Sequence, residues 1–144
     1  MRMTVEGMNN AYQVGNFYFG GQLNDAAMAH FKSLGVTKVY NLRNEEEGDF
    51  SWEEDFCEKE GMQYKQIPFL VDGAVNDDCV KELSSLNESD KALIHCASGN
   101  RIGAWYVIYC VKNKGLSFDE ASKLAFEVGL TNPGLLGPVQ EYLS

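Results

Sequence analysis

The sequence predicts a single α/β domain, residues 1–144, built on a mostly parallel central sheet flanked by helices. Three observations support this fold class. Segments with strand character alternate with helical segments along most of the chain, an order typical of parallel sheets. The segment 92–96 (ALIHC) is short and apolar, as expected for a strand at the centre of such a sheet. A length of 144 residues with 44% hydrophobic residues is enough for one core, which we expect at about residues 16–128.

Four segments have the composition and the flanking residues of strands. They are residues 16–19 (NFYF), 37–42 (TKVYNL), 63–69 (QYKQIPF, closed by Pro68) and 92–96. Two of the connections stand out because they carry acidic residues. We expect a solvated loop at Glu45–Glu47 and a second loop over residues 70–78 (LVDGAVNDD).

Capping residues and glycines predict the helices between these strands. The expected helices are residues 26–34 (capped by Asn24 or Asp25), a helix from the Ser51/Glu54 capping-box pattern to Gly61, residues 77–86, residues 102–113 before Gly115, a helix from the Ser117/Glu120 capping box to about Val128, and a short C-terminal helix. The helix over residues 102–113 is apolar nearly all round, so we expect it to be buried.

Charge and composition exclude several classes of function. The formal net charge is −9, with 12 Lys+Arg against 21 Asp+Glu and no basic stripe, so binding to nucleic acid or to an anionic membrane surface is disfavoured. No apolar run is long enough to span a membrane, and the N-terminal MRMTVEGMNN lacks the apolar region of a signal peptide. We therefore expect a cytoplasmic protein.

The cysteine pattern argues against a metal site. No CxxC pair is present among the four cysteines, and the chain has only two histidines, so a zinc centre is not expected. Cys57, Cys79 and Cys110 are interpreted as buried small hydrophobic residues in helices. Free thiols are typical of a reducing compartment.

The segment 96–101 (CASGNR) between the central strand and the buried helix has the features of an anion site. A loop that runs from a strand into a helix N-terminus gathers unpaired backbone N–H groups, and Gly99 allows the backbone to turn them inward. Arg101 adds a planar fork suited to a tetrahedral oxyanion. Cys96 lies in the same positive field, which favours the nucleophilic thiolate. Each residue alone fits a structural role, and the combination favours a functional one.

Other candidate residues near this loop have open alternatives. His95 precedes Cys96, so its side chain lies on the opposite face of the strand and either orients the loop by hydrogen bonds or serves the core. His30 is expected to be structural. Arg43 follows a predicted strand, and an ion pair with Glu45–Glu47 is preferred over a place at the mouth of the site.

The segment IHCASGNR resembles the H-C-x-x-G-x-x-R signature of the cysteine-dependent protein tyrosine and dual-specificity phosphatases, with His95, Cys96 and Gly99 at matching positions. The segment QYKQIPFLVDG resembles the part of dual-specificity phosphatases that carries a mobile acid, and it places Asp72 there. The N-terminal FYFGGQLNDAAMAHFKSLGVTKVYNLR resembles a bacterial branch of this superfamily, the phosphatase-like domain related to domains fused to beta-lactamase-like hydrolases.

This resemblance implies a cysteine-phosphatase-like fold and a set of residue roles. Cys96 would attack phosphorus and form a phosphocysteine. Asp72 would protonate the leaving oxygen and then activate water, with Asp77 and Asp78 as nearby alternatives that a helix N-terminus also explains. The phosphoryl oxygens would be held by the segment Ala97, Ser98, Gly99, Asn100 and Arg101. No metal or organic cofactor would be required, and the partner would be a phosphorylated or other oxyanion substrate.

Two departures from the phosphatase pattern keep other functions open. Four residues separate Cys96 from Arg101, whereas the phosphatase loop has five, and Ile102 replaces the hydroxyl residue that follows the arginine in phosphatases. A loop of four residues resembles that of the rhodanese-type sulfurtransferases, in which the cysteine carries a persulfide. The alternatives are therefore a sulfurtransferase with a Cys96 persulfide and a non-catalytic module that only binds an oxyanion.

Overall fold

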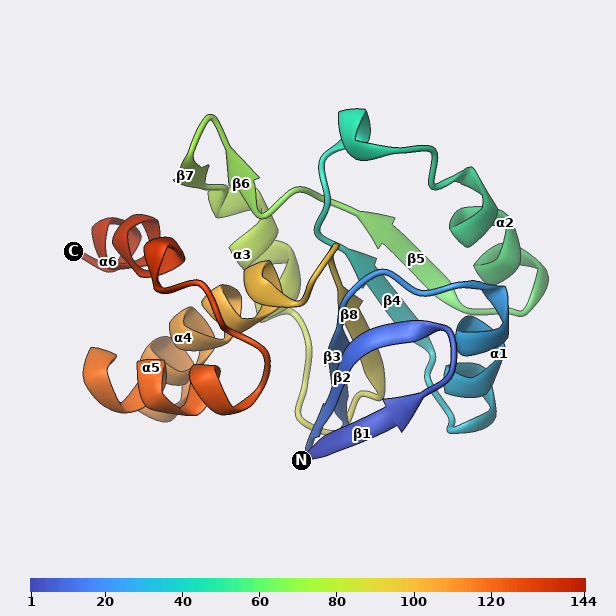
Figure 1. Ribbon diagram of the computed structural model, residues 1–144, viewed down its shortest axis with the longest axis horizontal. Helices are drawn as coiled ribbons and strands as arrows, with labels where there is room; N and C mark the ends of the chain where they lie inside the picture. The colour runs from blue at the N-terminus through green and yellow to red at the C-terminus, as the bar shows by residue number, and fades with distance from the viewer.

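The computed structural model describes residues 1–144 and contains a six-stranded mixed sheet with helices on both faces (Figure 1). The strand order is β1-β2-β3-β8-β4-β5, in which β3, β8, β4 and β5 are parallel and β1 to β3 form an antiparallel meander. The strands are β1 (Arg2–Val5), β2 (Met8–Val14), β3 (Phe17–Gly20), β4 (Lys38–Asn41), β5 (Gln63–Gln66) and β8 (Ala92–His95). The α/β class and the central place of residues 92–95 are confirmed.

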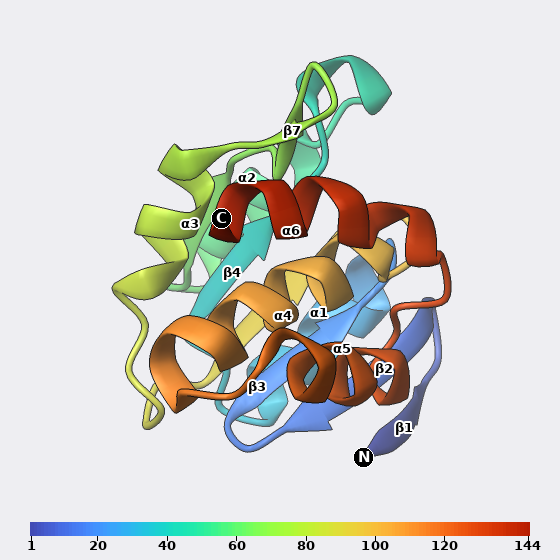
Figure 2. The ribbon, with the colours of Figure 1, turned by 90° about the vertical axis from the view of Figure 1, so that its left-hand side faces the viewer.

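Helices cover the two faces of the sheet unequally (Figures 1 and 2). One face carries α1 (Asp25–Ser33) and α2 (Ser51–Lys59), with 13 buried residues beneath them. The other face carries α3 (Asp77–Ser84), α4 (Asn100–Lys114), α5 (Phe118–Glu127) and α6 (Leu136–Leu143), with 25 buried residues. Burial of apolar surface on both faces explains why β8, the shared central strand, is buried at every position.

The two N-terminal strands have no counterpart among the predicted strands. β1 is the edge strand of the sheet and β2 lies beside it, and the polar residues of both are exposed. The two segments therefore lack the apolar run that marks a central strand. Val5, Met8 and Ala11 are nevertheless buried, as is Val139 in α6. Buried side chains therefore lie on both sides of the expected core range of about 16–128.

Residues 70–75 of the predicted loop form a hairpin, and Asp77 and Asp78 begin α3. The hairpin strands β6 (Leu70–Val71) and β7 (Ala74–Val75) pair antiparallel across a two-residue turn. Asp72 and Gly73 both adopt positive φ, 51° and 79°, the backbone conformation that Asp-Gly favours in tight hairpins. Strands of only two residues are too short for an alternating pattern to be visible in the sequence.

The helix caps were predicted correctly at α1 and α5 and wrongly at α2. Asn24 caps α1, and the reciprocal Ser117/Glu120 capping box opens α5. At α2, Ser51 is the first helical residue, and its own N–H donates to Asp49 Oδ1 at 3.0 Å. The expected Ser51/Glu54 box does not form because the carboxylate two residues earlier takes that N–H.

Helix α4 is buried along its length and determines where the site lies. Every residue from Ile102 to Cys110 is buried, and Gly115 ends the helix with φ 67°. The helix begins at Asn100, two residues before the predicted start, so Arg101 is in its first turn. Gly103 lies against Leu130, and a Cβ there would be 2.7 Å from the Leu130 Cβ.

Candidate active site

The loop from Cys96 to Arg101 leaves the carboxyl end of β8 and is tied to the neighbouring strands. The Cys96 N–H donates to the Gly20 carbonyl at 3.1 Å. The carbonyl oxygen of Ala97 accepts from the Gln22 N–H at 3.0 Å, and that of Ser98 accepts from Asn10 Nδ2 at 2.9 Å. With these carbonyl groups bonded to the surrounding chain, the loop has a fixed path.

The N–H groups of the same loop are left for a ligand. Gly99 has φ 96° and directs its N–H to Cys96 Sγ at 3.1 Å. The N–H groups of Ala97, Ser98 and Asn100 have no acceptor within the protein. Together with the N-terminus of α4 they form a cradle that favours negative charge beside the thiol.

Asn100 holds the start of α4 through its side chain. Its Oδ1 accepts the N–H groups of Thr131 at 2.7 Å and of Asn132 at 2.8 Å. The Asn100 side chain therefore anchors the loop to the segment that precedes the 3₁₀-helix η2 (Pro133–Leu135). Any contact of Asn100 with an oxyanion would come from its backbone.

Arg101 is paired with a glutamate that the sequence had placed in a solvated loop. Its Nη1 donates to Glu47 Oε2 at 2.6 Å and its Nη2 to Glu47 Oε1 at 2.8 Å. Glu47 ends the 3₁₀-helix η1 (Glu45–Glu47). The hydrogen bond from Arg101 holds the pKa of the Glu47 carboxyl down at about 2, and it raises the pKa of Arg101. Glu45, Glu46 and Glu47 are exposed, as predicted, but they form a 3₁₀-helix rather than a loop, and the Glu47 carboxylate is paired.

Arg43 reaches the same carboxylate from the end of β4. Its Nε lies 3.2 Å from Glu47 Oε1, so the predicted ion pair with Glu45–Glu47 is confirmed at Glu47. Its Nη1 donates to Gln22 Oε1 at 2.9 Å, and its guanidinium carbon lies 4.9 Å from the centre of the Phe50 ring. Glu47 thus bridges two guanidinium groups, one on each side.

His95 is buried in a carboxylate pair. Its Nε2 lies 2.6 Å from Glu53 Oε1, and both side chains are fully buried. Its Nδ1 lies 3.4 Å from the carbonyl oxygen of Cys96. The side chain turns toward α2, opposite the thiol, as the strand alternation predicts. Glu53 has no distinguishing signal in the sequence, because it lies in a helix with three other acidic residues.

The candidate acids lie in different settings. Asp72 is exposed at the turn of the β6–β7 hairpin, which rises at the same end of the molecule as η1 (Figure 2). Asp77 is engaged elsewhere, since its Oδ1 accepts from the Tyr142 hydroxyl at 2.6 Å and its Oδ2 pairs with Lys81 at 3.0 Å. Asp78 is exposed in the first turn of α3.

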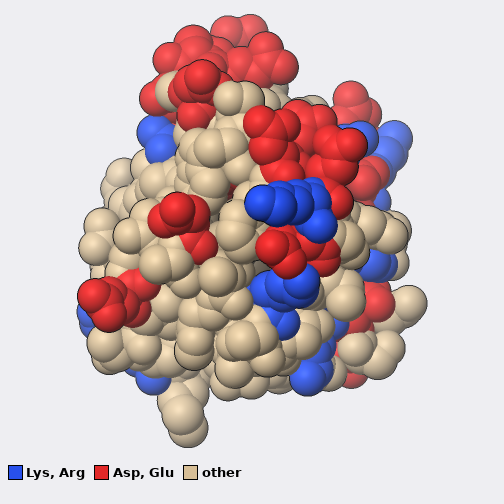
Figure 3. All heavy atoms as spheres, turned by 90° about the vertical axis from the view of Figure 1, so that its right-hand side faces the viewer, with Lys and Arg blue, Asp and Glu red and all other residues tan.

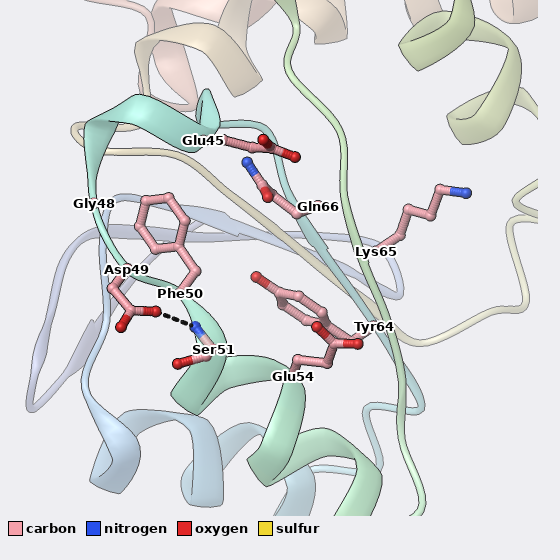
Figure 4. A pocket seen from close by; sticks show the side chains of 9 residues that line it. All are labelled: Glu45, Gly48, Asp49, Phe50, Ser51, Glu54, Tyr64, Lys65 and Gln66. Atoms are coloured by element: carbon pink, nitrogen blue, oxygen red, sulfur yellow. Dashed lines mark hydrogen bonds between the residues drawn. The ribbon is translucent and has the colours of Figure 1, made fainter.

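The larger cavities do not include Cys96, which is fully buried. One cavity of about 480 Å³ is lined by the carboxylates of Glu45, Asp49 and Glu54 with Lys65 as its single cation, so it disfavours an oxyanion (Figure 4). Acidic side chains also gather on the outer face over η1 and α2 (Figure 3). A second cavity of about 550 Å³ has Gln22, Arg43 and Glu47 in its wall.

Comparison with known proteins identifies the fold. No protein-family model and no curated protein matches the chain. A candidate phosphatase (DUF442) from Shewanella putrefaciens CN-32 matches with TM-score 0.71 and 18% identity over 94% of this chain and 90% of that one. TpbA from P. aeruginosa matches with TM-score 0.75 and 17% identity over 97% and 88%.

A third match is the core catalytic domain of the PP-IP phosphatase SIW14 from S. cerevisiae, with TM-score 0.69 and 18% identity over 96% of this chain and 88% of that one. The chain has the cysteine-phosphatase fold. Within that fold the Cys96 loop follows the central parallel strand, where α/β sheets bind ligands at the carboxyl ends of their strands. None of the helices is both long and apolar enough to cross a membrane.

Proposed function

We propose that the protein is a cysteine-dependent phosphatase that hydrolyses phosphomonoesters through a phosphocysteine on Cys96. The observation that carries the proposal is the loop itself: a thiol and unpaired N–H groups lie together at the carboxyl end of β8, and Arg101 follows in the first turn of α4. This arrangement stabilises a developing negative charge next to a nucleophile. The fold adds support, and a structure of TpbA, one of the matches, holds phosphotyrosine.

The reaction would proceed in two displacements. The Cys96 thiolate forms a bond to phosphorus while the phosphorus–oxygen bond to the leaving group breaks, and Asp72 gives its proton to the leaving oxygen. Water then attacks the phosphocysteine, Asp72 takes a proton from the water, and the sulfur–phosphorus bond breaks to release phosphate. Arg101 and the loop N–H groups hold the phosphoryl oxygens in both steps.

A second candidate is a sulfurtransferase, favoured by the size of the loop. Only four residues separate Cys96 from Arg101, and the Cys96 side chain is fully buried. A single sulfur atom needs less room than a phosphoryl group. In this reaction the thiolate takes the outer sulfur of thiosulfate and releases sulfite, and cyanide then accepts the sulfur as thiocyanate. No general acid is needed, so Asp72 would be dispensable.

A paired assay separates the two candidates. Phosphate release from an aryl phosphate and thiocyanate formation from thiosulfate and cyanide are measured for the wild type, Cys96→Ser and Cys79→Ser. Cys79 is a free buried thiol in α3 and serves as the matched control. The phosphatase is supported if Cys96→Ser alone abolishes phosphate release. Thiocyanate formation without phosphate release establishes the sulfurtransferase, and the absence of both activities with retained phosphate binding indicates a non-catalytic module.

A further inference from the structure

A chain of hydrogen-bonded side chains joins the two ends of the Cys96 loop along the carboxyl edge of the sheet. It begins beside Cys96, where His95 pairs with Glu53, and it ends where Glu47 holds Arg101. In order, its members are His95, Glu53, Gln22, Arg43, Glu47 and Arg101. The chemistry described above uses only the last of these side chains directly.

Gln22 is the link between the two halves of this chain. Its Nε2 donates to Glu53 Oε2 at 3.0 Å, and its Oε1 accepts from Arg43 Nη1 at 2.9 Å. Only a side chain with a donor and an acceptor on one group can satisfy a carboxylate on one side and a guanidinium on the other. The Gln22 N–H also donates to the Ala97 carbonyl, so its backbone is fixed to the loop.

The second half of the chain transmits this restraint to the catalytic arginine. With Nη1 held by Gln22, Arg43 directs its Nε to Glu47 Oε1 at 3.2 Å. Glu47 in turn grips both Nη atoms of Arg101. This grip uses two of the five N–H donors of the guanidinium and leaves the others for an oxyanion.

We propose that Gln22 is a positioning residue that sets the orientation of Arg101 over Cys96 by fixing Arg43 and Glu47 against the buried Glu53–His95 pair. The inference rests on the proposed function only in that both candidate reactions use Arg101 beside Cys96. Misplacement of a group that holds the reacting atoms lowers kcat strongly, even when the substituted residue is remote from the chemistry.

Two substitutions at Gln22 test this role. Gln22→Met keeps the length of the side chain and removes its hydrogen bonds to Glu53, to Arg43 and to the Leu23 carbonyl. We expect kcat to fall by about 10²-fold with a much smaller change in KM, the usual effect of misplacing a group that holds the reacting atoms. Gln22→Glu keeps the acceptor for Arg43 but places a carboxylate against Glu53, so it should be impaired at neutral pH. Two carboxylates this close share a proton as the pH falls, and the protonated group again donates to one partner and accepts from the other.

We therefore expect the activity of Gln22→Glu, relative to that of the wild type, to recover as the pH is lowered. The charged and titratable groups around Gln22 are Glu53, Arg43, Glu47, Asp25 and Asp49. Those around its partner Glu53 are His95, Tyr64 and Cys57. Because the wild type carries the same groups, its own pH profile is the reference. Gln13→Glu is the matched control, since Gln13 is exposed on β2 and its side chain donates a hydrogen bond only to the Gly15 carbonyl.

A spectroscopic measurement keeps the inference separate from the proposed function. The chain has three arginines, so the side-chain Nε–H signals of Arg2, Arg43 and Arg101 can be resolved by NMR on ¹⁵N-labelled protein. Gln22→Met should shift or broaden the Arg43 and Arg101 signals and leave that of the exposed Arg2 unchanged. If the wild type turns over neither substrate, the proposed function fails. The NMR signals then still test whether Gln22 fixes Arg43 and Arg101. Unchanged Arg101 signals, or a Gln22→Met variant as active as or more active than the wild type, would overturn the inference.

Discussion

Arg101 and Glu47 form a two-point ion pair, with both Nη atoms of the guanidinium on the two oxygens of the carboxylate at 2.6 and 2.8 Å. The pair joins the first turn of α4 to η1, which lie 54 positions apart in the chain. A planar guanidinium held in this way cannot rotate out of its plane without losing one of the two bonds. Its remaining donors are thus available in a fixed direction.

Replacement of Arg101 by lysine should show that geometry matters beyond charge. The ammonium keeps the positive charge but cannot hold Glu47 at two points and an oxyanion as well. We expect kcat to fall by about 10²- to 10³-fold, the usual effect of losing one oxyanion donor. Steady-state kinetics of Arg101→Lys on whichever substrate the wild type accepts provides the check, and a loss of less than tenfold would contradict it.

Glu47 should make folding stability depend on pH in the acidic range. Its pKa is about 2 in the folded protein against an ordinary value of 4.5, so its contribution is fully present above about pH 4.5 and is lost as the pH falls toward 2. The variant Glu47→Gln should therefore be less stable than the wild type at neutral pH and approach it near pH 2. Urea unfolding at several pH values measures the difference in free energy of unfolding between the two proteins. A difference that does not change with pH would show that the Arg101–Glu47 pair contributes nothing.

Asp72 offers a test of the general acid that preserves the hairpin. Asp72→Asn retains a residue type that tolerates the positive φ of 51°, so the turn should remain intact. If Asp72 protonates the leaving oxygen, kcat should fall by about 10²- to 10⁴-fold on a phenyl phosphate with a poor leaving group and far less on one with a good leaving group. If the variant is as active as the wild type on each of the two substrates, Asp72 is not the general acid.

Gly103 should be intolerant of even one added methyl group. A Cβ at this position would lie 2.7–2.9 Å from the Leu130 Cβ, N and Cα atoms, two of which belong to the backbone. We expect Gly103→Ala to destabilise the fold by about 1–3 kcal/mol through overpacking. Gly137→Ala, at a helical glycine with open space around it, should be neutral or stabilising by up to about 1 kcal/mol. Urea unfolding of the two variants gives the comparison, and equal effects would contradict the packing argument.

The parts of the fold that the sequence predicted are those with local signals. Alternation of strands and helices, the Ser117/Glu120 box and the apolar segment before Cys96 all depend on neighbours within a few residues. The strands β1 and β2 and the hairpin at Asp72 depend instead on pairing, because edge strands and two-residue strands carry little apolar periodicity.

The same division holds for the candidate site. Cys96, Gly99 and Arg101 could be selected because they are contiguous and their combination is chemically unusual. Glu47 and Glu53 could not, since each lies in an acidic segment in which every member is an equally good candidate for a solvated residue. What distinguishes these two carboxylates is a partner that folding brings to them, Arg101 for one and His95 for the other.

The bond from Asn10 Nδ2 to the Ser98 carbonyl has a consequence for how the protein is made. It spans 88 positions, so the first strands leave the ribosome long before the residues that they must brace. Pairings between such distant residues form slowly, because the chain between them must first be brought together. The Cys96 loop can therefore reach its final path only after most of the chain has been synthesised, and the cradle of N–H groups beside the thiol should form late.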